Sequence, residues 1–209
     1  MKKISMALLI SLVLLLPAGG TALAGHAEAP APGEVREFLP GSVPAETGPA
    51  ESMSPALHAL VLACLDQEAA RFDLDDRDLA WEGLYIMLSL YGQMDSRSVT
   101  EEGELFLPEE TVQDYAAALD LDLEELGEPP AAIRDRLDYD SASRCFVVVC
   151  GSDDLARIQV DSAPAPGGGL SLAGALVYEA EDRILARFQA ELQPRDNMFG
   201  YAITAMDVS

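Results

Sequence analysis

The chain of 209 residues has little positive charge, with 13 lysines and arginines against 36 aspartates and glutamates and a formal charge of −23. Its only lysines are Lys2 and Lys3. Nucleic-acid binding depends on Lys and Arg side chains that displace counterions from phosphates, so this deficit excludes nucleic acid as a partner. An acidic surface also repels anionic lipid headgroups and polyanionic substrates.

The chain has few groups suited to nucleophilic or metal chemistry, with two histidines and three cysteines. His26 follows an apolar leader, where nothing holds it, and His58 flanks an apolar helical stripe. The sequence contains no glycine-rich phosphate loop, no G-x-S-x-G and no paired Cys/His spacing. We therefore predict no catalytic residue, no metal ligand set and no cofactor.

Carboxylates are the one chemical group in excess. They crowd two segments, Asp73, Asp75, Asp76 and Asp78 in one and Asp120, Asp122, Glu124 and Glu125 in the other. An EF-hand calcium loop needs glycine at its sixth position, which both segments lack. We interpret both as helix caps and solvated charge, and calcium binding stays open. A glycosidase-like hydrolase needs two carboxylates converging across a cleft, and the sequence nominates no pair.

The three cysteines give no evident disulfide. Cys145 and Cys150 lie in one predicted strand, where five residues span about 16 Å. A disulfide needs Cα atoms within about 7 Å, so these two cannot bond while the strand is regular. Cys64 could meet either of them, and the odd count leaves at least one thiol free.

The first 24 residues have the three parts of a bacterial export signal. Lys2 and Lys3 form a positive region, and the apolar run 6–16 is shorter than the roughly 20 residues that span a bilayer. An A-x-A cleavage site ends at Ala24. His26 stands where a lipobox has its lipid-accepting cysteine, so we expect a secreted or extracytoplasmic protein without a lipid.

Residues 25–52 hold much of the proline together with Ala, Gly and Glu. Such a stretch buries too little apolar surface to offset the entropy of ordering, so we predict a flexible tether. Residues 53–209 then form a single domain, with helices in 53–138 and strands in 139–209.

The helical part is predicted from apolar residues at helical spacing and from capping residues. A first helix begins at Ser54, and Asp78 caps a second one that is apolar nearly all round and ends at Gly92. A third helix begins at Pro108, where acidic residues in its first turn complement the helix dipole. A short fourth helix is expected after Pro130.

After residue 140 the apolar period changes from 3.6 to 2. Strands are predicted at 145–150, 155–160, 170–178, 183–193 and 199–208. Their connections are too short for crossovers, so we predict an antiparallel meander of about five strands. Its apolar face needs the helices as cover, which gives an α+β fold. By analogy, this order fits a cystatin-like or nuclear-transport-factor-like curved sheet wrapped on helices.

Four segments of the folded region resemble a known group of proteins. They are Trp81-Glu82-x-Leu84-Tyr85, Leu90-Tyr91-Gly92, a stretch from Gly103 to Ala116 with Leu107-Pro108 and Asp114-Tyr115, and Tyr139-Asp140. They look like small exported proteins, often lipoproteins, of Gram-positive gut anaerobes. The resemblance implies export and a shared fold, and it implies no activity. The missing lipobox cysteine departs from many members.

We therefore expect a non-catalytic binding or interaction domain of the cell envelope or extracellular space. Its partner would be an unknown protein, peptide or glycan. The predicted binding surface is the polar side of strand 183–193, with Arg183, Arg187, Gln189 and Glu191. We expect no transmembrane segment after leader cleavage, and a monomer unless a sheet edge pairs with another chain. The alternative is a carboxylate-based hydrolase acting on envelope glycan or peptide.

The leader generates a first testable prediction. We expect the exported protein to begin at Gly25 and to carry no lipid, because the sequence offers no lipobox thiol. Mass spectrometry of the intact protein and of its N-terminal peptide measures both. A retained leader or an acyl adduct would contradict the prediction.

Overall fold

The computed structural model describes residues 48–101, 103–152 and 155–209. The predicted export signal, 1–24, and residues 25–47 of the predicted tether lie outside the described residues. Within the described part, no helix is both long and apolar enough to cross a membrane. The α+β class predicted from the sequence is confirmed, with helices mostly before strands and every strand pairing antiparallel.

Three of the predicted helices are present close to their expected positions. The α-helices are α1 (Pro49–Ser52), α2 (Ser54–Asp66), α3 (Arg77–Tyr91), α4 (Glu109–Ala118) and α5 (Leu123–Leu126), and short 3₁₀ turns are η1 (Gly92–Met94) and η2 (Pro166–Gly168). Asp76 caps α3 in place of Asp78, because the Asp76 carboxylate accepts from the backbone N–H groups of Asp78 and Leu79. Helix α1 lies inside the predicted tether, so folded structure begins before residue 53.

The helix predicted after Pro130 is wrong. The carbonyl of Ile133 accepts from the N–H groups of Arg136 and Leu137, which makes one turn. The chain then becomes extended and pairs with a neighbouring strand from Leu137 onward. Both Ile133 and Leu137 are buried. The spacing of Ile133 and Leu137, four residues apart, is therefore as compatible with a turn followed by a strand as with a helix.

The strands form two separate sheets. The five-stranded sheet has the order β1-β9-β8-β7-β6, with β1 (Arg71–Phe72), β6 (Ala156–Pro164), β7 (Leu170–Tyr178), β8 (Arg183–Pro194) and β9 (Tyr201–Val208). The four-stranded sheet has the order β2-β3-β5-β4, with β2 (Val99–Glu101), β3 (Glu104–Pro108), β4 (Leu137–Asp140) and β5 (Cys145–Val149). The predicted meander is the run β6 to β9.

Strand β5 departs from the predicted meander, because it pairs with β3 and β4 and not with β6. The connection after β5 was expected to be a hairpin turn, and it leads instead to the other sheet. It passes close to helix α3, where the N–H of Gly151 donates to the carbonyl of Ser89. A Cβ at Gly151 would lie 2.7 Å from the Ser89 hydroxyl, so any larger residue would have to displace that side chain.

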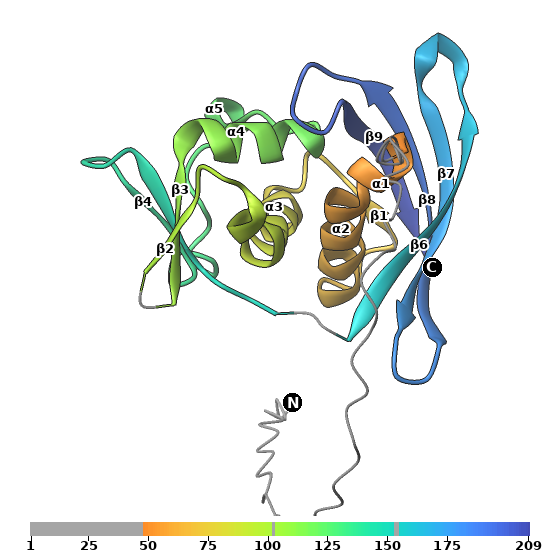
Figure 1. Ribbon diagram of the computed structural model, residues 1–209, viewed down its shortest axis with the longest axis horizontal. Helices are drawn as coiled ribbons and strands as arrows, with labels where there is room; N and C mark the ends of the chain where they lie inside the picture. Colours follow the sequence, from red (N-terminus) through yellow and green to blue (C-terminus); the bar gives the residue numbers. More distant parts are fainter. Residues whose placement is uncertain (1–47, 102, 153–154) are drawn as a thin grey trace, which may run out of the picture. The chain divides into compact units, whose positions relative to one another are not determined.

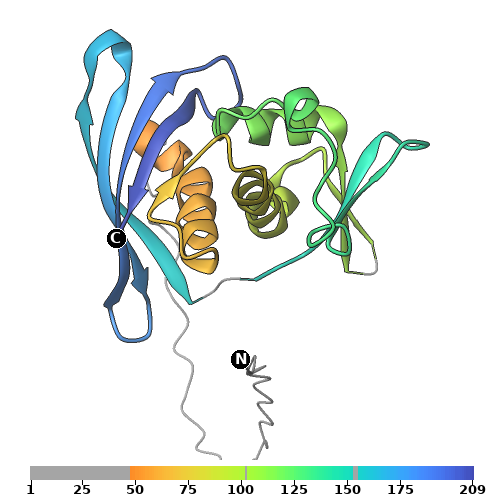
Figure 2. The ribbon, with the colours of Figure 1, turned by 180° about the vertical axis from the view of Figure 1, so that it is seen from behind.

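Helices α2 and α3 lie side by side between the two sheets (Figure 1, and from behind in Figure 2). Helix α2 contacts β6 and β9 of the larger sheet, and α3 contacts β5 of the smaller one. The largest fully buried side chains include Trp81, Leu84, Met87 and Leu88 of α3. The nearly all-round apolar surface predicted for this helix is thus explained by its central position.

A partly buried ion pair ties helix α3 to the segment that precedes β4. The Arg136 guanidinium donates to both carboxylate oxygens of Glu82, at 3.3 and 3.0 Å, and lies 4.3 Å from the centre of the Tyr85 ring. Glu82 is 7% exposed. Removing Arg136 would leave the buried Glu82 carboxylate without its partner, which is costly. The ion pair therefore holds the segment before β4 against helix α3.

Strand β7 packs tightly against its neighbours at Gly174, so a substitution there tests the packing of the larger sheet. A Cβ at Gly174 would overlap the carbonyl oxygen of Gln159 and the ring of Phe188. We predict that Gly174→Ala lowers the free energy of unfolding by about 1–3 kcal/mol, as overpacking does. Urea unfolding measures this value. Gly48→Ala is the control, because a Cβ there meets nothing within 4 Å. Equal stability of the Gly174 variant and the wild type would contradict the packing.

Candidate functional site

The predicted binding side chains of strand β8 lie on the outer face of the larger sheet, the face turned away from α2. On β8, Ala186, Phe188, Ala190 and Leu192 are buried against the core, and the residues between them are exposed. The predicted alternation is thus confirmed over most of the strand. It fails at Ile184, which is 44% exposed. A bulge shifts the β7–β8 register between Leu176 and Val177, and this shift turns Ile184 to the outer face.

A depression of about 650 Å³ lies on this outer face. Its central strand, β7, contributes only small side chains there. We define the alanine trough by its floor, Ala173 and Ala175 on β7, and by its two walls, Gln159 and Asp161 on β6 and Arg187 and Gln189 on β8. The walls are two strand spacings apart, or about 10 Å. The trough therefore follows the strand direction and has room for an extended chain.

The charged side chains in and around the trough differ in whether they already make an ion pair or a hydrogen bond. Within the described part of the chain, neither the Arg187 guanidinium nor the Asp161 carboxylate makes an ion pair. Asp207, at the far side of β8, is held by Arg71 at 2.8 Å. The hydroxyl of Ser171 donates to the Glu191 carboxylate at 2.9 Å, just beyond the floor. The trough thus offers one cation on one wall and one anion on the other.

The four predicted binding residues do not all share this surface. Arg187 and Gln189 line the trough, and Glu191 continues the same wall. Arg183 lies apart, where its guanidinium pairs with Glu181 at 3.3 Å and sits 5.9 Å from the centre of the Tyr178 ring.

The sequence pattern did not predict the opposite wall, Gln159 and Asp161, or the floor, Ala173 and Ala175. Gln159 did lie in a predicted strand, 155–160, on its polar side. These residues are identified only by the register of β6 on β7 in the structure, which places Gln159 and Asp161 directly beside the alanines.

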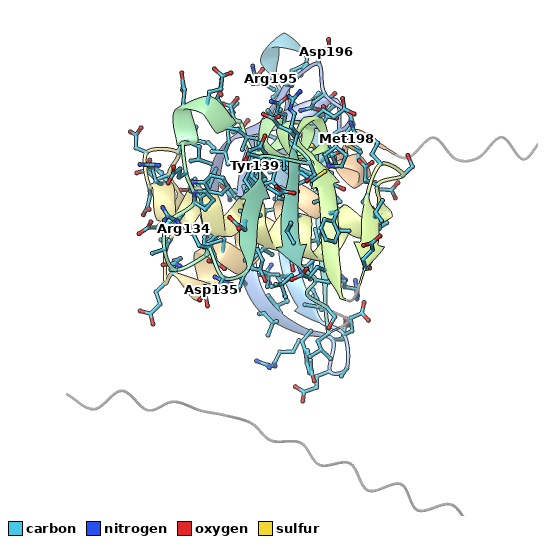
Figure 3. The ribbon with its side chains drawn as sticks, turned by 90° about the vertical axis from the view of Figure 1, so that its left-hand side faces the viewer. Arg134, Asp135, Tyr139, Arg195, Asp196 and Met198 are labelled. Carbon is cyan, nitrogen blue, oxygen red and sulfur yellow. The ribbon has the colours of Figure 1, made fainter. Side chains whose placement is uncertain are left out.

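A second concavity, of about 370 Å³, lies beside Trp81 on the other half of the molecule. Figure 3 looks onto the four-stranded sheet there and labels Tyr139, on β4. We define the aromatic groove by three rings and three carboxylates, Trp81, Tyr139, Phe146, Glu109, Glu124 and Glu128. The rings of Tyr139 and Phe146 are 4.9 Å apart. Carboxylates thus converge near aromatic side chains in this groove.

A general acid needs a raised pKa, and three carboxylates of the described chain, Glu109, Asp95 and Asp140, have lowered pKa values instead. In the aromatic groove, Arg144 at 2.8 Å and the hydroxyl of Tyr139 both donate to Glu109 and lower its pKa. Hydrogen bonds from Arg97 likewise lower the pKa of Asp95, and one from Ser143 lowers that of Asp140. These shifts favour permanently ionised side chains.

Three side chains of the acidic segments, among them the α3 cap Asp76, accept from backbone N–H groups. Asp73 accepts from the N–H of Asp75, and Asp122 caps α5 by accepting from the N–H of Glu124. Among the described residues, no group of three His, Cys, Asp or Glu side chains could hold a metal ion. The only described histidine, His58, is buried between α2 and α3 and contacts the hydroxyl of Tyr91 through Nδ1 at 2.5 Å.

All three cysteines are free. Cys145 begins β5 and Cys150 follows its last residue, so the strand separates them as the sequence predicted. Burial raises the pKa of the Cys64 thiol to about 11. The thiolate is the reactive form, so Cys64 packs as a small apolar side chain and is not a nucleophile.

No family model, curated protein or solved structure matches the chain. The resemblance to small exported proteins therefore stays a prediction.

Proposed function

We propose that the protein is an exported, non-catalytic binding domain of the cell envelope or extracellular space, and that the alanine trough holds an extended peptide or glycan. The observation that carries this proposal is the pairing of an alanine floor with polar walls. Small side chains leave space for a ligand, while Arg187 and Gln189 on one wall and Gln159 and Asp161 on the other offer donors and acceptors.

The chemistry of the walls fits a chain of alternating donors and acceptors. Side-chain amides can bind both peptide groups and sugar hydroxyls, because each amide carries a donor and an acceptor. The Arg187 guanidinium would take a carboxylate of the ligand, and such charge-assisted bonds are stronger than neutral ones. The overall charge of −23 further favours partners that carry some positive charge.

Export and the absence of a lipid belong to the same proposal. They rest on the leader, with its positive start, short apolar run and small-residue cleavage site, and on His26 at the position of the lipobox cysteine. A binding domain of the envelope would meet peptide and glycan chains there.

The second candidate is a carboxylate-based hydrolase in the aromatic groove. It is supported by the gathering of Glu109, Glu124 and Glu128 near the exposed ring of Tyr139, since sugars stack on aromatic rings and carboxylates cleave glycosidic bonds. The engagement of Glu109 by Arg144 speaks against it, because an ionised and paired carboxylate is a poor proton donor. We therefore prefer the trough.

We predict that Arg187→Glu weakens binding of soluble peptidoglycan fragments or peptides by about tenfold, the loss expected for one charge-assisted hydrogen bond. Isothermal titration calorimetry with both probe classes measures the dissociation constants. Arg183→Glu is the matched control, because it makes the same charge change on the same strand outside the trough. Its affinity should equal that of the wild type.

Two results would contradict this proposal. Equal weakening by both substitutions would assign binding to general positive charge and not to the trough. Turnover of either probe that is abolished by Glu109→Gln or Glu124→Gln would establish the hydrolase instead. Circular dichroism of each variant confirms that the fold is kept.

A further inference from the structure

Strand β6 forms one edge of the five-stranded sheet and is long for an edge strand. It has nine residues, whereas the other sheet edges are β1 with two residues, β2 with three and β4 with four. Its register on β7 runs without a bulge from Ala156 to Pro164. The hairpin of β6 and β7 stands at the right of Figure 1. One long side of β6 therefore faces away from its own sheet.

The hydrogen-bond pattern shows which backbone groups of β6 point outward. At the open end of the hairpin, the N–H of Glu179 donates to the carbonyl of Leu155 at 2.8 Å. At the turn, the N–H of Ala165 donates to the carbonyl of Gly169, also at 2.8 Å. Hydrogen-bonded pairs alternate in an antiparallel ladder, so odd-numbered β6 residues bond to β7. The N–H and C=O groups of Ile158, Val160 and Ser162 are therefore directed outward.

Edge strands usually carry a device that prevents pairing with another chain, such as a proline, a bulge or an inward-pointing charge. In β6 the only proline is the last residue, Pro164, and no bulge interrupts the pairing with β7. Ile158 and Val160 are partly buried and pack against the core. The only charges of β6 are Arg157 and Asp161, both exposed on the outer face. Among the described residues, no other strand pairs with this side of β6, so the edge can accept a partner strand.

We propose that the partner is a second copy of this chain, paired antiparallel through β6 about a two-fold axis at Gln159. The two five-stranded sheets would then form one continuous sheet. Ile158 of each copy lies opposite Val160 of the other, and each such pair exchanges two main-chain hydrogen bonds. This goes beyond the proposed function, because it concerns assembly. In the dimer Asp161 would be paired with Arg157, so a ligand in the trough would be held by Arg187, Gln189 and Gln159.

Charge complementarity supports this register over its neighbours. With the axis at Gln159, Arg157 of each copy lies opposite Asp161 of the other, so two opposite-charge pairs form across the interface. Shifting the axis to Ile158 or to Val160 keeps the outward hydrogen-bonding groups matched and separates every Arg157 from its Asp161. Cross-strand pairs of opposite charge stabilise a sheet, so the sequence of β6 is self-complementary in one register.

Arg157 can change partners at little cost. Its guanidinium now lies 3.0 Å from Asp182 and 3.9 Å from Glu179, and all three side chains are substantially exposed. Exposed ion pairs contribute little to stability, so exchanging one for a cross-strand pair is close to neutral. The strongly acidic chains repel each other at long range, and physiological salt screens this repulsion beyond about 8 Å.

Sedimentation velocity of the full exported chain in physiological salt tests the proposal over micromolar to sub-millimolar concentrations. We expect a dimer for the wild type and dimerisation about tenfold weaker for Asp161→Arg and for Arg157→Asp, since each places like charges opposite one another. The double variant Arg157→Asp/Asp161→Arg restores complementarity and should dimerise as the wild type does. Asp196→Arg, in the turn after β8, makes the same charge change away from the edge and should have no effect.

Hydrogen exchange supplies a second measurement. The amides of Ile158 and Val160 should exchange more slowly in the wild-type dimer than in the Asp161→Arg variant, compared at a concentration where the variant is monomeric. A monomeric wild type across the whole range would overturn the proposal. So would a double variant that associates no better than the single ones, or a dimer in which these two amides stay unprotected.

Discussion

The burial of helix α3 on nearly all of its sides is the constraint on which the rest of the structure depends. A helix with apolar residues around most of its circumference cannot lie on a surface, because one side would always face water. Here α2 and the larger sheet cover one side, and the four-stranded sheet covers the other. The inner faces of both sheets are therefore buried in the core, so a binding surface on either sheet would have to lie on its outer face or at its edge.

The two halves use their outer surfaces differently. The larger sheet presents a strip of small residues, Ala173 and Ala175, between polar walls. The smaller half presents the aromatic groove, where Glu109 is already held by Arg144 and Tyr139. An engaged carboxylate is a structural contact, whereas an unengaged charge beside a small-residue floor can be used by a ligand. This difference is the reason for placing function on the larger sheet.

Local sequence patterns predicted the long elements and failed where pairing partners are distant. Helices α2, α3 and α4 and the β6–β9 meander follow apolar periods of 3.6 and 2 over many residues. The second sheet joins strands of three to five residues, too short for a pattern, and β3 pairs with β5 across a long separation. For the site, alternation in β8 indicated Arg187 and Gln189, but only the register shows that β6 supplies the opposite wall.

Chemical-shift mapping of ¹⁵N-labelled protein tests the central claim, that ligands bind the outer face of the larger sheet. With peptidoglycan fragments or peptides added, the account predicts that the perturbed amides gather at residues 159–161, 171–175 and 187–191. Perturbations centred on Gln113, Gly127 and Tyr139, which line the aromatic groove, would contradict it and move the functional site to the other half of the molecule.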